Sequence, residues 1–197
     1  MMDAMHVQEE HRTTDELRAG LDAVRGAPAD GGRIELIVAR HGEGERELLA
    51  SAEISRVDGL VGDTWLGRGN RRTPDGAADP DAQVTMMSAR AAALVTGGST
   101  DGHRDRWAEA GDQLYVDLDL SGDNLPAGTR LAVGDAVVEA TAKPHTGCAK
   151  FSARFGTDAA RFVNSPEGRA LNLRGINLRV VEPGTVRVGD VVRRVRG

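Results

Sequence analysis

Short apolar runs, separated by turn-forming residues, make up most of the chain after residue 33. Five of them have the length of β-strands, and they span residues 34–39, 48–57, 82–87, 114–120 and 137–142. The run at 114–120 is the clearest, because leucine or valine occupies every second position. Many short strands at this spacing predict a mainly β fold, and we expect a β-barrel with a few peripheral helices.

Helical patterns interrupt the strands in a few places. Leu17, Leu21 and Val24 share one face of a predicted helix that begins after Thr13. Glycine and proline between residues 26 and 32 then form a linker. We therefore divide the chain into an N-terminal extension, residues 1–32, and a barrel domain, residues 33–197. The extension is expected to pack on the body or on a neighbouring subunit. The other predicted helices span residues 89–95, 104–110 and 151–164.

The C-terminal half contains an internal repeat. Residues 126–138 and 183–192 each read as a turn, a short strand, a Gly-Asp turn and a second valine-rich strand. This similarity predicts two related hairpins in one sheet or barrel.

One long segment, residues 58–81, is rich in glycine and in charged residues. A connection of this length inside a compact domain is usually functional or mobile. Trp65 either forms an aromatic and cationic lip over a pocket together with the nearby Arg68, Arg71 and Arg72, or it anchors a mobile charged loop.

Composition narrows the class of protein. The 197 residues are 40% hydrophobic and 28% charged, which fits a globular domain, and with only 3% aromatic residues the core must be mostly aliphatic. A net charge of -5 argues against a nucleic-acid partner.

No stretch has the roughly 20 apolar residues that span a bilayer, and the start is polar and acidic, unlike a signal peptide. We expect a soluble, cytoplasmic protein with no membrane partner.

The single cysteine, Cys148, is the main candidate for chemistry. One thiol cannot form an internal disulfide or a cysteine-rich zinc site, and a lone cysteine is often an inert buried residue. Here, however, it follows a proline-terminated strand and precedes a helical pattern, so it is expected near a helix N-terminus. That position favours a thiolate, as do Lys143, Lys150 and a protonated His145.

Such a thiol could perform three kinds of chemistry. Hydrolysis by Cys148 and His145 is disfavoured, because the two usually come from different elements and no orienting acid is evident. The thiolate can instead carry sulfur as a persulfide, or it can ligate a soft metal centre. The residues leave these two open. The competing hypothesis is a non-enzymatic β-barrel that binds a small molecule or a protein, with Cys148 as a structural residue.

The chain resembles the MOSC domains, named after the C-terminal domain of molybdenum cofactor sulfurase. The resemblance extends in order over roughly residues 33–195 and includes one cysteine after a proline-terminated strand. One departure is that Thr64 and Trp65 follow Gly-Asp, where many relatives have a basic residue or histidine. The segments that carry the resemblance are residues 59–63, 83–88, 122–125, 131–135, 143–151, 174–177 and 188–192.

This resemblance implies a MOSC-like β-barrel in which Cys148 is the key residue. MOSC domains are proposed to carry sulfur as a persulfide for metal–sulfur cluster or cofactor assembly. Some relatives bind the molybdenum cofactor, molybdopterin, through a cysteine that ligates molybdenum, and they reduce N-hydroxylated compounds. Whether this chain is a sulfur carrier or a molybdenum-dependent oxidoreductase therefore stays open.

The resemblance and the residues together suggest a set of cofactor contacts. Some of these residues occupy motif positions of the family, some flank Cys148, and the arginines can grip a phosphate bidentately. The candidate cofactor-binding residues are Asp63, Asp123, Asn124, His145, Thr146, Lys150, Arg169 and Arg174.

The sulfur carrier and the oxidoreductase would each need a different partner protein. A sulfur carrier needs a cysteine desulfurase, and an oxidoreductase needs a redox partner protein. Nothing in the sequence resembles a pyridoxal-phosphate lysine site, so that cofactor would belong to the desulfurase.

Overall fold

The computed structural model describes residues 11–70, 73–97 and 104–195, and within them the chain alternates short strands with short helices. The strands are β1 (Gly32–Arg40), β2 (Arg46–Leu49), β3 (Ser51–Ser55), β4 (Gly59–Leu60), β5 (Val84–Ser88), β6 (Leu114–Asp117), β7 (Arg130–Val133), β8 (Ala136–Ala140), β9 (Ile176–Glu182), β10 (Gly184–Arg187) and β11 (Val191–Arg194). The helices are α1 (Thr14–Ala19), α2 (Leu21–Arg25), α3 (Trp65–Arg68), α4 (Ala89–Thr96), α5 (Arg104–Ala108), α6 (Ala149–Asn164), α7 (Pro166–Ala170) and a 3-10 turn η1 (Pro80–Ala82).

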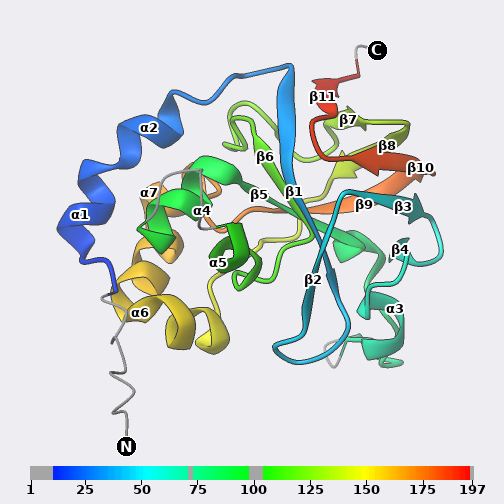
Figure 1. Ribbon diagram of the computed structural model, residues 1–197, viewed down its shortest axis with the longest axis horizontal. Coiled ribbons are helices and arrows are strands. Elements are labelled where there is room, and N and C mark those ends of the chain that lie inside the picture. Colours follow the sequence, from blue (N-terminus) through cyan, green and yellow to red (C-terminus); the bar gives the residue numbers. More distant parts are fainter. Residues whose placement is uncertain (1–10, 71–72, 98–103, 196–197) are drawn as a thin grey trace, which may run out of the picture.

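Seven of the described strands close into a barrel, in the order β11-β7-β8-β9-β5-β6-β1 (Figure 1). The barrel closes where β1 pairs with β11, with Gly32 opposite Val192 and Arg33 opposite Val191. Only β5 and β6 run parallel among these pairs, and they are joined through α4 and α5, as a parallel connection requires. The mainly β, barrel-like fold expected from the sequence is confirmed.

The interior of the barrel is aliphatic. Its buried cluster takes leucine, isoleucine, valine, methionine and alanine from all seven strands and contains no aromatic side chain. Along β1 the side chains alternate, with Ile37 in this cluster and Leu36 and Val38 on the opposite face. The prediction of a mostly aliphatic core, made from the low aromatic content, therefore holds for the barrel interior.

A layer of helices covers one side of the barrel (Figure 1). The aromatic residues Trp107, Tyr115, Phe151, Phe155 and Phe162 are buried between this layer and the strands. In the described part of the chain, no helix has the length and apolar character needed to cross a lipid bilayer.

The described part of the N-terminal extension, residues 11–32, packs on this helical layer. Helix α1 begins with a capping box between Thr13 and Glu16, so the expected cap is confirmed. Leu17, Leu21 and Val24 are buried in the aromatic cluster, where α1 contacts α6 and α2 contacts α4. Of the two positions expected for the extension, the structure shows packing on the body of the same chain.

The internal repeat forms two different arrangements. Strands β7 and β8 pair as the expected hairpin, whereas β10 pairs with β3 in a separate three-stranded sheet and β11 pairs with β7 and β1. The prediction of a second hairpin is therefore wrong. Strand β11 closes the barrel and has a neighbour on each side, so it has no free edge for β10.

Candidate functional site

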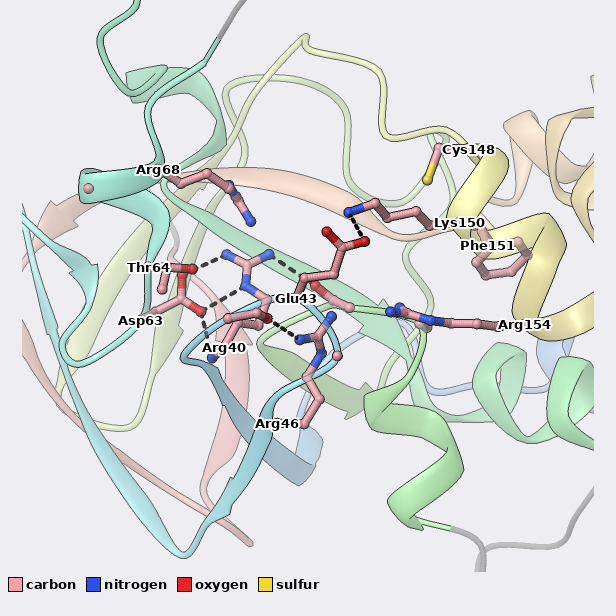
Figure 2. A pocket seen from close by; sticks show the side chains of 15 residues that line it. Arg40, Glu43, Arg46, Asp63, Thr64, Arg68, Cys148, Lys150, Phe151 and Arg154 are labelled. Carbon is pink, nitrogen blue, oxygen red and sulfur yellow. Dashed lines mark hydrogen bonds and ion pairs between the residues drawn. The ribbon is translucent and has the colours of Figure 1, made fainter.

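A cavity of about 700 Å³ opens beside the start of α6, and Cys148 lies on its wall (Figure 2). Its lining comes from segments far apart in the sequence: the end of β1 and the turn after it, the segment leading into α3, residues 110–111 and the first turns of α6. The ionisable side chains that line it, besides Cys148, are Arg40, Glu43, Arg46, Asp63, Arg68, Lys150 and Arg154.

Cys148 is exposed and is the N-cap residue of α6, so the expected helix start is confirmed. Its backbone carbonyl accepts a hydrogen bond from the Ser152 amide at 2.9 Å. The preceding Gly147 is held on both sides by Asn164, whose Oδ1 accepts from the Gly147 amide at 3.0 Å and whose Nδ2 donates to its carbonyl at 2.9 Å. A Cβ on Gly147 would lie 3.0 Å from Val163 and 3.2 Å from Asn164, so any larger residue would have to displace these two side chains by a few tenths of an ångström. The thiol therefore projects from a fixed loop.

Arg40 and Asp63 form a nearly inaccessible ion pair on the cavity wall. The Asp63 carboxylate accepts from Arg40 Nε at 2.7 Å, from Arg40 Nη2 at 2.8 Å and from the Trp65 amide at 2.8 Å. Burial alone would raise the pKa of Asp63, but the hydrogen bonds and charge of Arg40 outweigh it and lower that pKa. Asp63 thus positions Arg40, and its own charge is compensated.

Lys150 and Glu43 form a second pair, at 2.8 Å, and both side chains are largely exposed. Glu43 lies in the turn after β1, so this contact ties that turn to the start of α6 next to Cys148 (Figure 2). Because the pair is solvated, it contributes little to stability and can open readily.

The three remaining cations, Arg46, Arg68 and Arg154, have no ion-pairing carboxylate in the described residues. Arg46 donates to the carbonyls of Gly42 and Glu45, at 3.1 Å and 2.7 Å. Burial, followed by repulsion from Arg154 and Arg40, lowers the pKa of Arg46; burial and repulsion from Arg40 lower that of Arg68. Each guanidinium therefore lies in the positive potential of its neighbours, and an anion in the cavity would relieve this repulsion.

Behind the loop that carries Cys148, His145 and Arg174 meet at a buried carboxylate. Asp112 is fully buried, with Oδ1 3.0 Å from His145 Nε2 and Oδ2 paired with Arg174 Nη1. Burial would raise the pKa of Asp112, but the charge of Arg174 outweighs it, and the pKa is lowered. Burial and the charge of Arg174 lower the pKa of His145, so a neutral imidazole is expected at neutral pH.

This arrangement corrects two expectations about the surroundings of the thiol. A neutral His145 does not supply the cationic charge that was expected near Cys148, and Lys143 pairs with Asp79 instead. His145 instead lines a smaller recess of about 250 Å³, which shares Arg40 and Arg68 with the main cavity.

Other predicted contacts lie apart from the cavity. Asp123 is exposed, and Asn124 donates to the carbonyls of Ala29 and Asp119, at 2.9 Å and 2.7 Å, holding the linker against the barrel. Thr146, Arg169 and Arg174 line a different cavity, described below. Of the predicted cofactor contacts, the main cavity brings together Asp63 and Lys150 with Cys148, and the recess adds His145.

Sequence reasoning missed Arg40, Arg46, Arg154 and Asp112. Each has an ordinary local sequence context. Arg40 ends β1, Arg46 follows the turn after it, Arg154 lies within α6, and Asp112 lies in the connection between α5 and β6. No local pattern distinguishes them, because only the closure of the barrel and the docking of α6 bring them together.

The fold and the site define a class: β-barrel proteins with a single accessible cysteine beside a cationic cavity. The family model of the MOSC domain matches residues 74–193, and the chain belongs to the MOSC domain family. The match begins after Arg40 and Asp63, so it is narrower than the resemblance expected over residues 33–195.

Two solved structures are similar to this chain in fold. YiiM from Escherichia coli matches with a TM-score of 0.54 and 17% sequence identity, over 84% of this chain and 70% of that one. The YUAD protein APC1665 from Bacillus subtilis matches with a TM-score of 0.59 and 15% identity, over 84% of this chain and 97% of that one. No curated protein matches the sequence.

Proposed function

We propose that this MOSC domain protein binds the molybdenum cofactor in the main cavity, with the Cys148 thiolate as a molybdenum ligand. The observation that carries the proposal is the combination of an exposed thiol with three guanidinium groups that lack carboxylate partners in the described residues. Membership of the MOSC family supports it, since MOSC domains are associated with this cofactor.

The residues present fit such a group. A thiolate suits molybdenum in sulfur surroundings, and guanidinium groups bind phosphate bidentately. Arg46 Nε is buried and has no hydrogen-bond partner in the described residues, so it is a donor free for a ligand. A cavity of about 700 Å³ is also within the usual range for small-molecule sites.

The chain's own residues would bind and orient the group. Arg46, Arg68 and Arg154 would hold its phosphate, Asp63 keeps Arg40 directed at the cavity, and Asn164 fixes the loop that presents the thiol. When bound, the cofactor supplies two-electron redox chemistry. The activity we infer is reduction of an N-hydroxylated compound, which takes up two electrons and two protons and releases water. A redox partner protein would deliver the electrons.

The test is to express the protein in cells that make the cofactor, purify it without oxygen, and measure molybdenum and pterin per chain. We expect both in the wild type and a lower molybdenum content in Cys148→Ser. The exposed variant Arg18→Ala, outside the cavity, is the matched control and retains both. A wild type free of molybdenum and pterin, from cells whose other molybdenum enzymes are loaded, contradicts the proposal.

A sulfur carrier is the second candidate, and the exposure of Cys148 favours it. The Cys148 thiolate would attack the outer sulfur of a desulfurase persulfide, forming Cys148–S–S⁻ and releasing the desulfurase thiol. With no other cysteine in the chain, this persulfide is not lost to an internal disulfide. Both candidates need a reduced thiol, which agrees with the cytoplasm as the compartment we propose.

Intact-mass measurement after incubation with an active cysteine desulfurase and cysteine tests the second candidate. Addition of one sulfur atom to the wild type, and none to Cys148→Ser, supports a carrier. No added sulfur on the wild type, with an active desulfurase, contradicts the sulfur carrier.

A further inference from the structure

A second cavity, of about 420 Å³, shares no lining residue with the one that contains Cys148. Its walls are residues 122 and 125–127, residues 140–146 of the segment that leads to Cys148, Val163 of α6, α7 with the connection that follows it, and the start of β9. The proposed cofactor site does not use this cavity.

Its lining combines cationic and apolar side chains. Arg169 and Arg174 line it, the Lys143 amine is paired with Asp79, and no aspartate or glutamate is among the lining residues. Leu125 and Val163 are among the apolar ones. A site with this composition suits an anion that carries an apolar body.

Arg174 supplies an unused donor in this cavity. It is only 6% exposed, Nη1 pairs with Asp112, and Nη2 donates to the Ala110 carbonyl at 2.7 Å. Its Nε is buried and has no hydrogen-bond partner in the described residues. A buried donor without a partner costs free energy, and a ligand oxygen would satisfy it.

A second guanidinium is available at the cavity surface. Arg169 lies on α7 and is exposed, and no carboxylate forms an ion pair with it in the described residues. Both arginines line the cavity, and guanidinium groups favour planar anions such as carboxylates.

We propose that this second cavity binds a small organic monocarboxylate through Arg169 and Arg174, with the apolar part of the ligand against Leu125 and Val163. The ligand would also touch His145 and Thr146, which line the cavity and lie within three residues of Cys148. The inference does not depend on the molybdenum cofactor, because the two cavities have separate linings.

The experiment titrates acetate, propionate and benzoate into the purified protein, with isothermal calorimetry as the readout and benzyl alcohol as the uncharged control. Saturable binding of at least one carboxylate, with benzoate stronger than acetate, is expected. Arg169→Ala should weaken it about tenfold, the value of one charged hydrogen bond, and Arg169→Lys by less. Since Arg169 is exposed, neither variant should disturb the fold.

Arg18→Ala, which lies in neither cavity, is the matched control and should bind the carboxylates as the wild type does. Each of the following results overturns the proposal: no saturable binding of any of the three carboxylates, equal binding of benzyl alcohol, or binding unchanged in Arg169→Ala. If inorganic phosphate competes as strongly as benzoate, the site is a simple anion patch and the assignment to an organic acid is wrong.

Discussion

Arg46, Arg68 and Arg154 set the chemistry of the main cavity, because their charges are not balanced by carboxylates in the described residues. Burial lowers the pKa of Arg46 and of Arg68, and repulsion between the like charges that share this confined space lowers both further. The neighbouring Arg40 differs, since Asp63 compensates it. The cavity is therefore lined by two kinds of guanidinium group. The charge of Arg40 is neutralised by Asp63, whereas the charges of the other three arginines can attract an anion.

Inorganic phosphate should bind this cavity even without cofactor. We expect phosphate to raise the melting temperature of the wild type more than an equal ionic strength of sodium chloride does, because it binds the folded state. Arg154→Ala should remove most of this difference, and Arg18→Ala should keep it. Differential scanning calorimetry measures the effect, and an equal response of Arg154→Ala and the wild type would show that the cavity does not bind the anion.

Because the pKa of Asp63 is lowered, its ion pair should make the folded protein less stable as the pH falls. Its pKa is lowered from the ordinary 3.8, so its contribution is complete above about pH 4 and is lost as pH falls below that value. Asp63→Asn leaves Arg40 buried without a counter-charge and should cost about 3–5 kcal/mol at pH 7. Urea unfolding of both proteins should show this difference shrinking below pH 4. A difference that stays constant down to pH 3 would contradict the assigned pair.

The helix α6 and the loop before it position the thiol. Gly156, with a φ of 88°, interrupts the helix, and Asn164 at its end reaches back to Gly147. The start of α6 was predictable, because a proline ends the preceding strand and phenylalanines recur with helical spacing after Cys148. The clamp by Asn164 was not, since it depends on how the two halves of α6 bend.

Loss of the Asn164 clamp should loosen the loop. Asn164→Ala leaves the Gly147 amide and carbonyl without partners and should destabilise the protein by about 1–3 kcal/mol. Asn164→Asp keeps the acceptor but removes the donor, so its effect should be smaller. Hydrogen exchange at Gly147 should accelerate in the same order. Protection equal to that of the wild type in Asn164→Ala would refute the clamp.

The turn between β1 and β2 is held over the cavity by the solvated pair of Glu43 and Lys150. We expect Glu43→Gln to raise the alkylation rate of Cys148 by about two- to threefold with no change in melting temperature, because surface pairs contribute little to folding. Glu45→Gln, in the same turn, is the control and should leave the rate unchanged. A rate equal to that of the wild type in Glu43→Gln would show that this pair does not limit access.

At the scale of the whole molecule, the fold class was predictable and the pairing of distant segments was not. Alternation and turn residues indicated the strands, and the aliphatic composition matched the barrel interior. The second copy of the repeat, residues 183–192, gave a wrong prediction, because its local pattern is that of a hairpin. In the structure β11 pairs within the barrel and β10 pairs with β3, so the two strands do not pair with each other. The cationic cavity depends on the same long-range pairings.

The N-terminal extension is part of the same folded body. Leu17 is fully buried in the aromatic cluster between α1 and α6. Leu17→Ala should therefore destabilise the protein by about 2–5 kcal/mol, whereas Arg18→Ala, on the exposed face, should have little effect. Urea unfolding monitored by tryptophan fluorescence measures both. Equal stability of Leu17→Ala and the wild type would mean that the extension folds apart from the body.

X-ray absorption at the molybdenum edge tests the central claim most directly, because it counts the sulfur atoms bound to the metal. In protein purified without oxygen from cofactor-producing cells, the wild type should show one more sulfur neighbour than Cys148→Ala, in which the cavity arginines would still hold part of the cofactor through its phosphate. The same sulfur count in both proteins, or no molybdenum in the wild type, would contradict the assignment of Cys148 as the ligand.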